Sequence, residues 1–290
     1  STGFHAPSLA QQYYQTTSTN FIGGIPFDLV TFRVTNPAGI ALGAEPLQAE
    51  TSDNLSLGLV LTPVERLYVT IDAYRIRLED RITLSENLNS TAVRNWLNTN
   101  GFPDVAGGRY FTNALDTTTT GIDVVGTYGW ELAASTLDLM LGYNYNKTEI
   151  DRVAPNPAAL EAIDPTALRF GRVELGRFEV GAPRDKAMLN TVWTRGGLSL
   201  SATATRHGEF TLNNANPDLD QTFSAKWLLD LAATYRVEGW EFTVGGDNVF
   251  NDYPDEVLAA NSTSGQLIYP SQSPFGFNGA YVYGRIGYRW

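Results

Sequence analysis

Three arginines stand close together in a segment of the chain that shows no regular alternation. Arg169, Arg172 and Arg177 all lie between about residues 148 and 182. Such a cluster could hold an anionic ligand through charge-assisted hydrogen bonds. Glu174 and Glu179 alternate with the arginines, so a loop that neutralises its own charges is the favoured interpretation. The three arginines are therefore candidate substrate-binding residues.

A second segment, from about 81 to 108, adds two candidates. Trp96 lies within it and Arg109 lies at its end. Binding residues concentrate on loops that a rigid scaffold positions. We therefore expect substrate contacts from Trp96, Arg109, Arg169, Arg172 and Arg177.

The residues that usually bind metal ions are sparse. The chain has no cysteine, and its two histidines are His5 and His207. They are expected at the ends of distant strands, so we predict isolated histidines and no shared metal site. Asp218 and Asp220 could bind calcium through oxygen ligands, but an acidic turn-forming loop is favoured. We predict no metal and no cofactor.

Catalytic signatures are also missing from the sequence. It contains no GxSxG, GxxxxGK[ST] or HExxH motif, and therefore no nucleophile elbow, phosphate loop or zinc-protease helix. The formal net charge of -11 argues against a nucleic-acid partner. The sequence predicts a protein that is not an enzyme and has no catalytic residues.

Alternation with a period of two dominates the segments between these candidates. Leu55, Leu57, Leu59 and Leu61 share one face, and comparable apolar faces start at Leu67, Ile122, Leu137, Trp227 and Trp240. Such alternation indicates strands with one apolar and one wet face. We predict nine complete strands and the end of a tenth, from Ser1 to about Ala6.

The connections between these strands alternate in length. Short ones lie near residues 62–64, 132–134, 195–197 and 237–239, and long ones cover about 7–50, 81–108, 148–182, 208–221 and 251–279. Tight turns at one end and long loops at the other are typical of outer-membrane barrels. A soluble β-sandwich also fits the alternation, but loops of this length are unusual in a compact soluble domain.

The tryptophans support the membrane interpretation independently. Trp130, Trp193, Trp240 and Trp290 are all expected at the short-turn ends of their strands. Aromatic rings gathered at one depth form a girdle at a membrane interface. A soluble β-sandwich gives no reason for the tryptophans to gather at one end of the strands.

The last strand, GAYVYGRIGYRW, divides its residues between two environments. Val282, Ile286, Tyr288 and Trp290 share the apolar face, whereas Arg285 and Arg289 lie on the opposite one. We expect the first set to face lipid and the second to face the wet interior of a barrel.

Four stretches of the sequence resemble TonB-dependent outer-membrane receptors. STGFHAPSLAQQYY resembles the "GFRAPS" stretch, with His5 where arginine is usual, and PLQAETSDNLSLGLVL resembles "L.PE.S...E.G". GWEFTVGGDNVFNDYP resembles "V.NLFN..Y", and PFGFNGAYVYGRIGYRW resembles the closing segment. The matches follow the family's order from Gly3 to Trp290.

The resemblance implies a particular architecture and a set of partners. The family fold is an antiparallel up-and-down transmembrane barrel of about 22 strands around a plug, so residues 1–290 would be its C-terminal portion, with about ten strands. The remaining strands, the plug and a TonB box would lie outside this chain. Partners would be outer-membrane lipid, these missing parts, the TonB complex through the N-terminal part and, for the closing strand, the barrel-assembly machinery.

The function that the resemblance implies is energised uptake across the outer membrane of a Gram-negative bacterium. The nutrient would be scarce and bulky: a siderophore, cobalamin, a metal complex or an oligosaccharide. Two alternatives stay open at this point. One is a complete ten-stranded barrel enzyme, such as an omptin-like protease, and the other is a passive porin.

Overall fold

The computed structural model describes residues 1–22, 25–103, 105–262 and 265–290. Within these ranges, ten strands pair with their neighbours into one antiparallel sheet in the order β1-β4-β5-β6-β7-β8-β9-β12-β13-β14. The strands are β1 (Thr2–His5), β4 (Glu50–Leu61), β5 (Leu67–Leu84), β6 (Gly108–Leu132), β7 (Ser135–Val153), β8 (Asp185–Arg195), β9 (Leu198–His207), β12 (Lys226–Val237), β13 (Trp240–Asp247) and β14 (Tyr281–Tyr288). The predicted up-and-down sheet and its strand number are confirmed, and the described sheet is not closed, with β1 and β14 at its edges.

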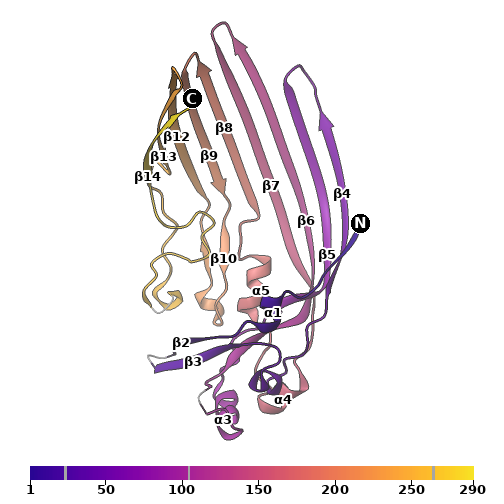
Figure 1. Ribbon diagram of the computed structural model, residues 1–290. Helices are drawn as coiled ribbons and strands as arrows, with labels where there is room; N and C mark the ends of the chain where they lie inside the picture. Colours follow the sequence, from indigo (N-terminus) through magenta and orange to yellow (C-terminus); the bar gives the residue numbers. More distant parts are fainter. Residues whose placement is uncertain (23–24, 104, 263–264) are drawn as a thin grey trace.

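The two ends of the sheet differ, as Figure 1 shows. Tight turns join β4 to β5, β6 to β7, β8 to β9 and β12 to β13, and they lie together at the upper end of the view. In the turn between β12 and β13, Glu238 and Gly239 both have a positive φ, which a two-residue hairpin turn of the type I′ class requires. The predicted alternation of short and long connections is confirmed.

The residues of the apolar faces line up across strands. One row joins opposite residues of seven strands: Leu61, Val69, Gly126, Leu141, Leu189, Ala204 and Leu229. Residues directly opposite one another in an antiparallel pair lie on the same face. The six apolar sets read from the sequence therefore form one continuous surface, which we call the apolar belt. Its side chains are half-buried or exposed, and none of the residues in this row is buried; Leu57 of the same surface is 77% exposed.

The tryptophans of the short-turn end also lie where the sequence predicts. Trp130, Trp193 and Trp240 are within three residues of a tight turn, and Trp290 follows β14. The Trp240 ring lies 4.7 Å from that of Tyr288, and Tyr128 and Trp130 make an edge-on contact at 5.1 Å. An aromatic girdle therefore borders the apolar belt at this end.

The long connections contain more regular structure than the sequence predicts. They carry α1 (Leu9–Tyr13), β2 (Thr16–Ile22), β3 (Ile25–Phe32), α2 (Pro37–Ala41), α3 (Thr91–Thr99), α4 (Ala158–Ile163), α5 (Arg172–Glu179), β10 (Phe210–Leu212), η1 (Pro217–Leu219), β11 (Gln221–Phe223) and η2 (Ala259–Asn261). In addition, β5 and β7 continue to Leu84 and Val153, past the expected strand ends. Short helices carry too few residues for a clear 3.6-residue period, so periodicity does not reveal them.

Among the described residues, no helix is both long enough and apolar enough to cross a membrane.

Candidate functional site

The long loops pack around a hydrophobic core of their own, at the lower end of Figure 1. This loop core consists of Val30, Phe32, Ala38, Leu42, Ala44, Leu88, Val93, Leu97, Tyr110 and Leu160. Its members come from three connections that are far apart in the sequence. Strand β3 also pairs in parallel with β6, from Val30 opposite Gly108 to Phe32 opposite Tyr110. Three of the loops are therefore folded against one another.

Polar bonds at the edge of the loop core join the same connections. The Tyr110 hydroxyl donates to the carbonyl oxygen of Leu42 at 2.9 Å, and the Ser90 hydroxyl donates to Asp164 Oδ2 at 2.6 Å. Ser90 also accepts a hydrogen bond from Val93 N at the start of α3. The hydrogen bonds from Ser90 and Thr166 lower the pKa of Asp164 to about 2. This carboxylate therefore links α3 to the end of α4.

Two of the predicted substrate-binding residues lie in or beside the loop core. Trp96 is on α3 and packs against the core while remaining partly exposed. Arg109 is on β6, where its Nε donates to Thr31 Oγ1 at 3.3 Å. The geometry leaves part of each side chain open to solvent, and their contact with a substrate stays a prediction.

Arg169 is buried, with 7% of the residue exposed. Its Nη2 donates to the carbonyl oxygen of Pro155 at 2.7 Å, and its guanidinium carbon lies 5.9 Å from the Phe170 ring centroid. The side chain therefore organises the backbone of the 148–182 segment, and a direct ligand contact would require this packing to open.

Arg172 holds two loops together. It forms a two-pronged ion pair with Asp220, with both N–O distances at 2.6 Å, and it also donates to the carbonyl oxygen of Asn214. The hydrogen bonds from Arg172, together with one from Asn214 N, lower the pKa of Asp220 to about 2. We call this pair the Arg172–Asp220 clasp. The clasp contains Asp220, one of the two aspartates that the sequence analysis considered as calcium ligands.

Arg177 lies on α5 and pairs with Glu174 one helical turn before it, at 2.9 Å. Burial raises the pKa of the Glu174 carboxyl, and the charges of Arg177 and Arg109 oppose that shift. The structure thus places two of the predicted arginines around one glutamate. It does so on the helix α5, where the sequence favoured a loop that neutralises its own charges.

The two histidines lie in separate places, as expected. His5 Nδ1 is 2.9 Å from Glu50 Oε1, across the β1–β4 pair. The His207 ring lies 5.6 Å from that of Phe275. Within the described ranges, no group of three or more His, Cys, Asp or Glu side chains is arranged to hold a metal ion.

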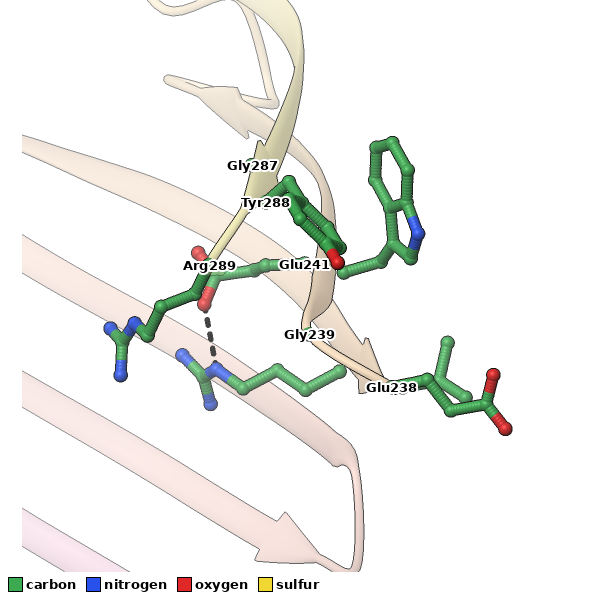
Figure 2. Close-up of a pocket in the computed structure, with 9 residues that line it drawn as sticks. Glu238, Gly239, Glu241, Gly287, Tyr288 and Arg289 are labelled. Carbon is green, nitrogen blue, oxygen red and sulfur yellow. Dashed lines mark hydrogen bonds and ion pairs between the residues drawn. The ribbon is translucent and has the colours of Figure 1, made fainter.

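The closing strand β14 separates its side chains as the sequence predicts. Val282 and Ile286 lie in register with Gly246 and Phe242 on the apolar belt and are 76% and 69% exposed. Figure 2 shows Tyr288 on one side of the sheet and Arg289 and Glu241 on the other. The Glu241 carboxylate accepts from Arg236 Nε at 2.6 Å, beside a hollow of about 450 Å³. Trp290 is fully exposed at the end of the chain.

Sequence reasoning missed a group of stacked rings in the loop between β13 and β14. Tyr253 stacks on Tyr269 at 5.4 Å, and Tyr269 on Phe277 at 6.4 Å. Tyr281 stacks on Tyr283 at 6.1 Å on the polar face of β14. The density of Tyr and Phe after residue 250 was the available signal, but ring stacking depends on a loop conformation that periodicity does not report.

A family described as TonB dependent receptor-like, beta-barrel matches residues 1–249. No curated protein matches the sequence.

Solved structures resemble the chain over most of its length. A mutant of the ferric enterobactin receptor PfeA from Pseudomonas aeruginosa covers 99% of the chain with a TM-score of 0.56 and 18% identity. The FrpB iron transporter from Neisseria meningitidis covers 84% with a TM-score of 0.55 and 11% identity. The chain spans 37% and 32% of these two proteins, and 27% of the matched chain in the FpvAI-pyocin S2 complex. At such identities the likeness shows the fold alone.

Proposed function

The chain belongs to the TonB-dependent receptor family, and from this premise we propose that it forms part of an outer-membrane receptor for energised nutrient uptake. The observation that carries the proposal is the continuous apolar belt opposite a polar face, with tight turns at one end and folded loops at the other. In the proposed setting, the belt faces lipid, the polar face lines the lumen, and the long loops lie outside the cell.

We propose that residues 1–290 are the C-terminal portion of the receptor barrel. The edges at β1 and β14 need partners, because unpaired strand edges are not tolerated in lipid. The remaining strands and the plug would supply them and fill the lumen. The TonB complex would act through the N-terminal part, and the barrel-assembly machinery would engage the closing strand, with Val282, Ile286, Tyr288 and Trp290 toward lipid. No nucleic-acid partner is proposed.

The nutrient classes proposed are a siderophore, cobalamin, a metal complex or an oligosaccharide. Structures of similar fold carry names such as ferric enterobactin receptor and iron transporter, which favours an iron chelate among the four. We propose Trp96, Arg109, Arg172 and Arg177 as loop residues that meet the ligand. Arg169 would affect ligand binding indirectly, because its hydrogen bond to the Pro155 carbonyl holds the loop backbone in place.

The proposal is tested by uptake in cells that carry the complete receptor. Accumulation of radiolabelled iron chelates, cobalamin or oligosaccharides should require both the receptor and a functional TonB protein. Uptake that persists without TonB would favour a passive porin. Cleavage of peptides by the purified receptor would favour the omptin-like enzyme. Fractionation that leaves the protein out of the outer membrane would refute the barrel assignment.

A further inference from the structure

The apolar belt ends, on the side of the long loops, in a row of polar side chains on β5, β6 and β7, which are neighbours in the sheet (Figure 1). Arg75 is opposite Thr120, and Thr120 is opposite Lys147. We call these three residues the basic row. We propose that the basic row binds the phosphate group of a membrane lipid in the leaflet on the loop side. This inference rests on the proposed receptor function, because it requires the belt to face lipid.

The basic row lies directly at the border of the belt. The next row toward the short turns, on the same face of the sheet, consists of Ala73, Ile122 and Tyr145. Tyr145 is 39% exposed, and an amphipathic ring of this kind is typical of a membrane interface. The basic row is therefore adjacent to an interface residue.

The height of the belt places the basic row at the level of the lipid headgroups. Thr120 is ten residues along β6 from Trp130 of the aromatic girdle. At about 3.4 Å per residue this separation is about 34 Å along the strand, and a tilt of about 40° reduces it to about 26 Å across the membrane. Outer-membrane barrels have an apolar band about 25 Å tall. If Trp130 lies at one interface, Thr120 therefore lies at the other, where lipid phosphates are found.

The charges nearest the belt are positive, and the carboxylates lie farther from it. Lys147 pairs at 2.5 Å with Glu149, which is two residues closer to the loops on β7. On β5, Arg77 pairs with Glu79 at 3.1 Å in the same direction. On β5, β6 and β7, all of which the structure describes, no carboxylate lies on the belt face between the basic row and the girdle. An anion that approaches from the membrane side therefore meets the cations first.

Arg75 has no protein partner in the described part of the chain. Its side chain is exposed and makes no hydrogen bond or ion pair there. By contrast, Arg206 on the same face of β9 pairs with Asp185. The guanidinium group offers a fork of N–H donors that matches phosphate oxygens. Arg75 is therefore the member of the row most open to a lipid phosphate.

The spacing of the basic row suits a phosphate group. Arg75 and Lys147 flank Thr120 from the two adjacent strands, each about 4.8 Å away. Their long side chains can converge above the Thr120 side chain, which is exposed. A phosphate group there would accept hydrogen bonds from the guanidinium, the ammonium and the hydroxyl groups. The apolar stems of both cations would lie along the belt, beside the acyl chains of the same lipid.

Arg195 provides a contrast at the opposite border of the belt. It is exposed on the belt face of β8, two residues beyond Trp193, and its neighbour on β9 is Leu198. A single cation attracts anionic lipids in general, whereas the basic row combines two cations with a hydroxyl group. Arg195→Gln is therefore the matched control for the loss of one exposed cation from the same face.

The experiment measures lipid binding to the complete purified receptor in detergent by native mass spectrometry. The probes are diphosphoryl lipid A and a neutral diacylglycerol. Arg75→Gln and Lys147→Gln should each weaken lipid A binding about 5-fold, the loss expected for one cation near a membrane surface. Thr120→Val should weaken it about 3- to 10-fold through the lost hydrogen bond. Arg75→Lys should retain most of the binding, and Arg195→Gln should bind as the unsubstituted receptor does.

Diacylglycerol binding should be the same in all variants, and heat-modifiable gel mobility should show that each variant folds. An equal loss of lipid A binding in Arg195→Gln would indicate general attraction of anionic lipids and overturn the inference. Displacement of lipid A by an excess of inorganic phosphate would overturn the assignment to a lipid.

Outer-membrane fractionation and TonB-dependent uptake, measured on the same variants in cells, test the receptor function separately. Variants of the basic row that bind lipid A as well as the unsubstituted receptor, while fractionation and uptake are normal, would refute the lipid site and leave the receptor function intact. Absence of the unsubstituted protein from the outer membrane would instead refute the receptor function itself.

Discussion

The loop core and the apolar belt use the same residue types in opposite ways. In the loop core, Leu97 and Tyr110 are completely buried by side chains from other loops. In the belt, Leu57 and Val282 point away from the protein and are mostly exposed. The loop core follows the rule for a soluble domain, in which apolar area is removed from water by other protein atoms. In the proposed receptor, lipid removes the apolar side chains of the belt from water.

This contrast predicts that equal substitutions have unequal effects in the two regions. The folded loops should lose stability when a buried side chain is replaced by a smaller one, because their interior is closely packed. The stability of the sheet should fall when a charge is placed on the apolar belt and should change little when a charge is placed on the polar face. The strands of the sheet should stay paired through their backbone hydrogen bonds after either kind of substitution.

The largest effect is expected from emptying the loop core. Phe32→Ala removes a ring that is 1% exposed and should cost about 3–5 kcal/mol of loop stability. Phe242→Ala, on the belt, is the control, since that ring is 43% exposed and should cost less. Hydrogen exchange at α3 in the intact receptor measures the difference. Similar exchange in both variants would remove the distinction between the two regions.

The next effect is expected from placing a charge on the belt. Leu141 lies at the centre of the apolar face of β7, and Leu141→Arg should destabilise the barrel by roughly 2–4 kcal/mol at mid-membrane depth. Its neighbour Met140 is on the polar face, so Met140→Arg should be tolerated far better. Urea unfolding in lipid vesicles compares the two. Equal losses would contradict the assignment of the faces.

A smaller effect concerns the Arg172–Asp220 clasp, which joins loops outside the loop core. The depressed pKa of Asp220 means that the clasp is fully present above about pH 4, the ordinary carboxyl range, and is lost as the pH falls through about 2. Arg172→Ala should therefore loosen the 208–221 loop at neutral pH.

The chain has no cysteine, so spin labels at Leu168→Cys and Asp218→Cys would report this loosening specifically. The distance distribution between the labels should broaden in Arg172→Ala and stay narrow in the parent at pH 5. A parent distribution that is already broad at pH 5 would show that the clasp does not hold the loops.

The smallest effect is expected at Arg177, the exposed partner of the Arg177–Glu174 pair on α5. Arg177 is 48% exposed in its side chain, and pairs of this kind one helical turn apart contribute about 0.3–0.5 kcal/mol. Arg177→Ala should thus change loop exchange rates only slightly. Hydrogen exchange at α5 measures this, and an effect as large as that of Phe32→Ala would place Arg177 within the packed interior.

Local patterns in the sequence determined most of the sheet. The faces of β7, the apolar side of β14 and the short-turn positions of Trp130 and Trp240 all follow from a two-residue period and from turn residues. These features depend on neighbours in the chain, because a strand presents alternate residues to opposite faces wherever it pairs.

Only the tertiary structure decided what the long loops do. Arg169 is buried against its own segment, the partnership of Arg172 with Asp220 joins two loops, and Leu160 and Leu42 from two loops share the loop core. Such contacts depend on which loops the sheet brings to the same end and on how their side chains fill the space between them. No period in the sequence carries that information, because loop packing is set by shape and partner in three dimensions.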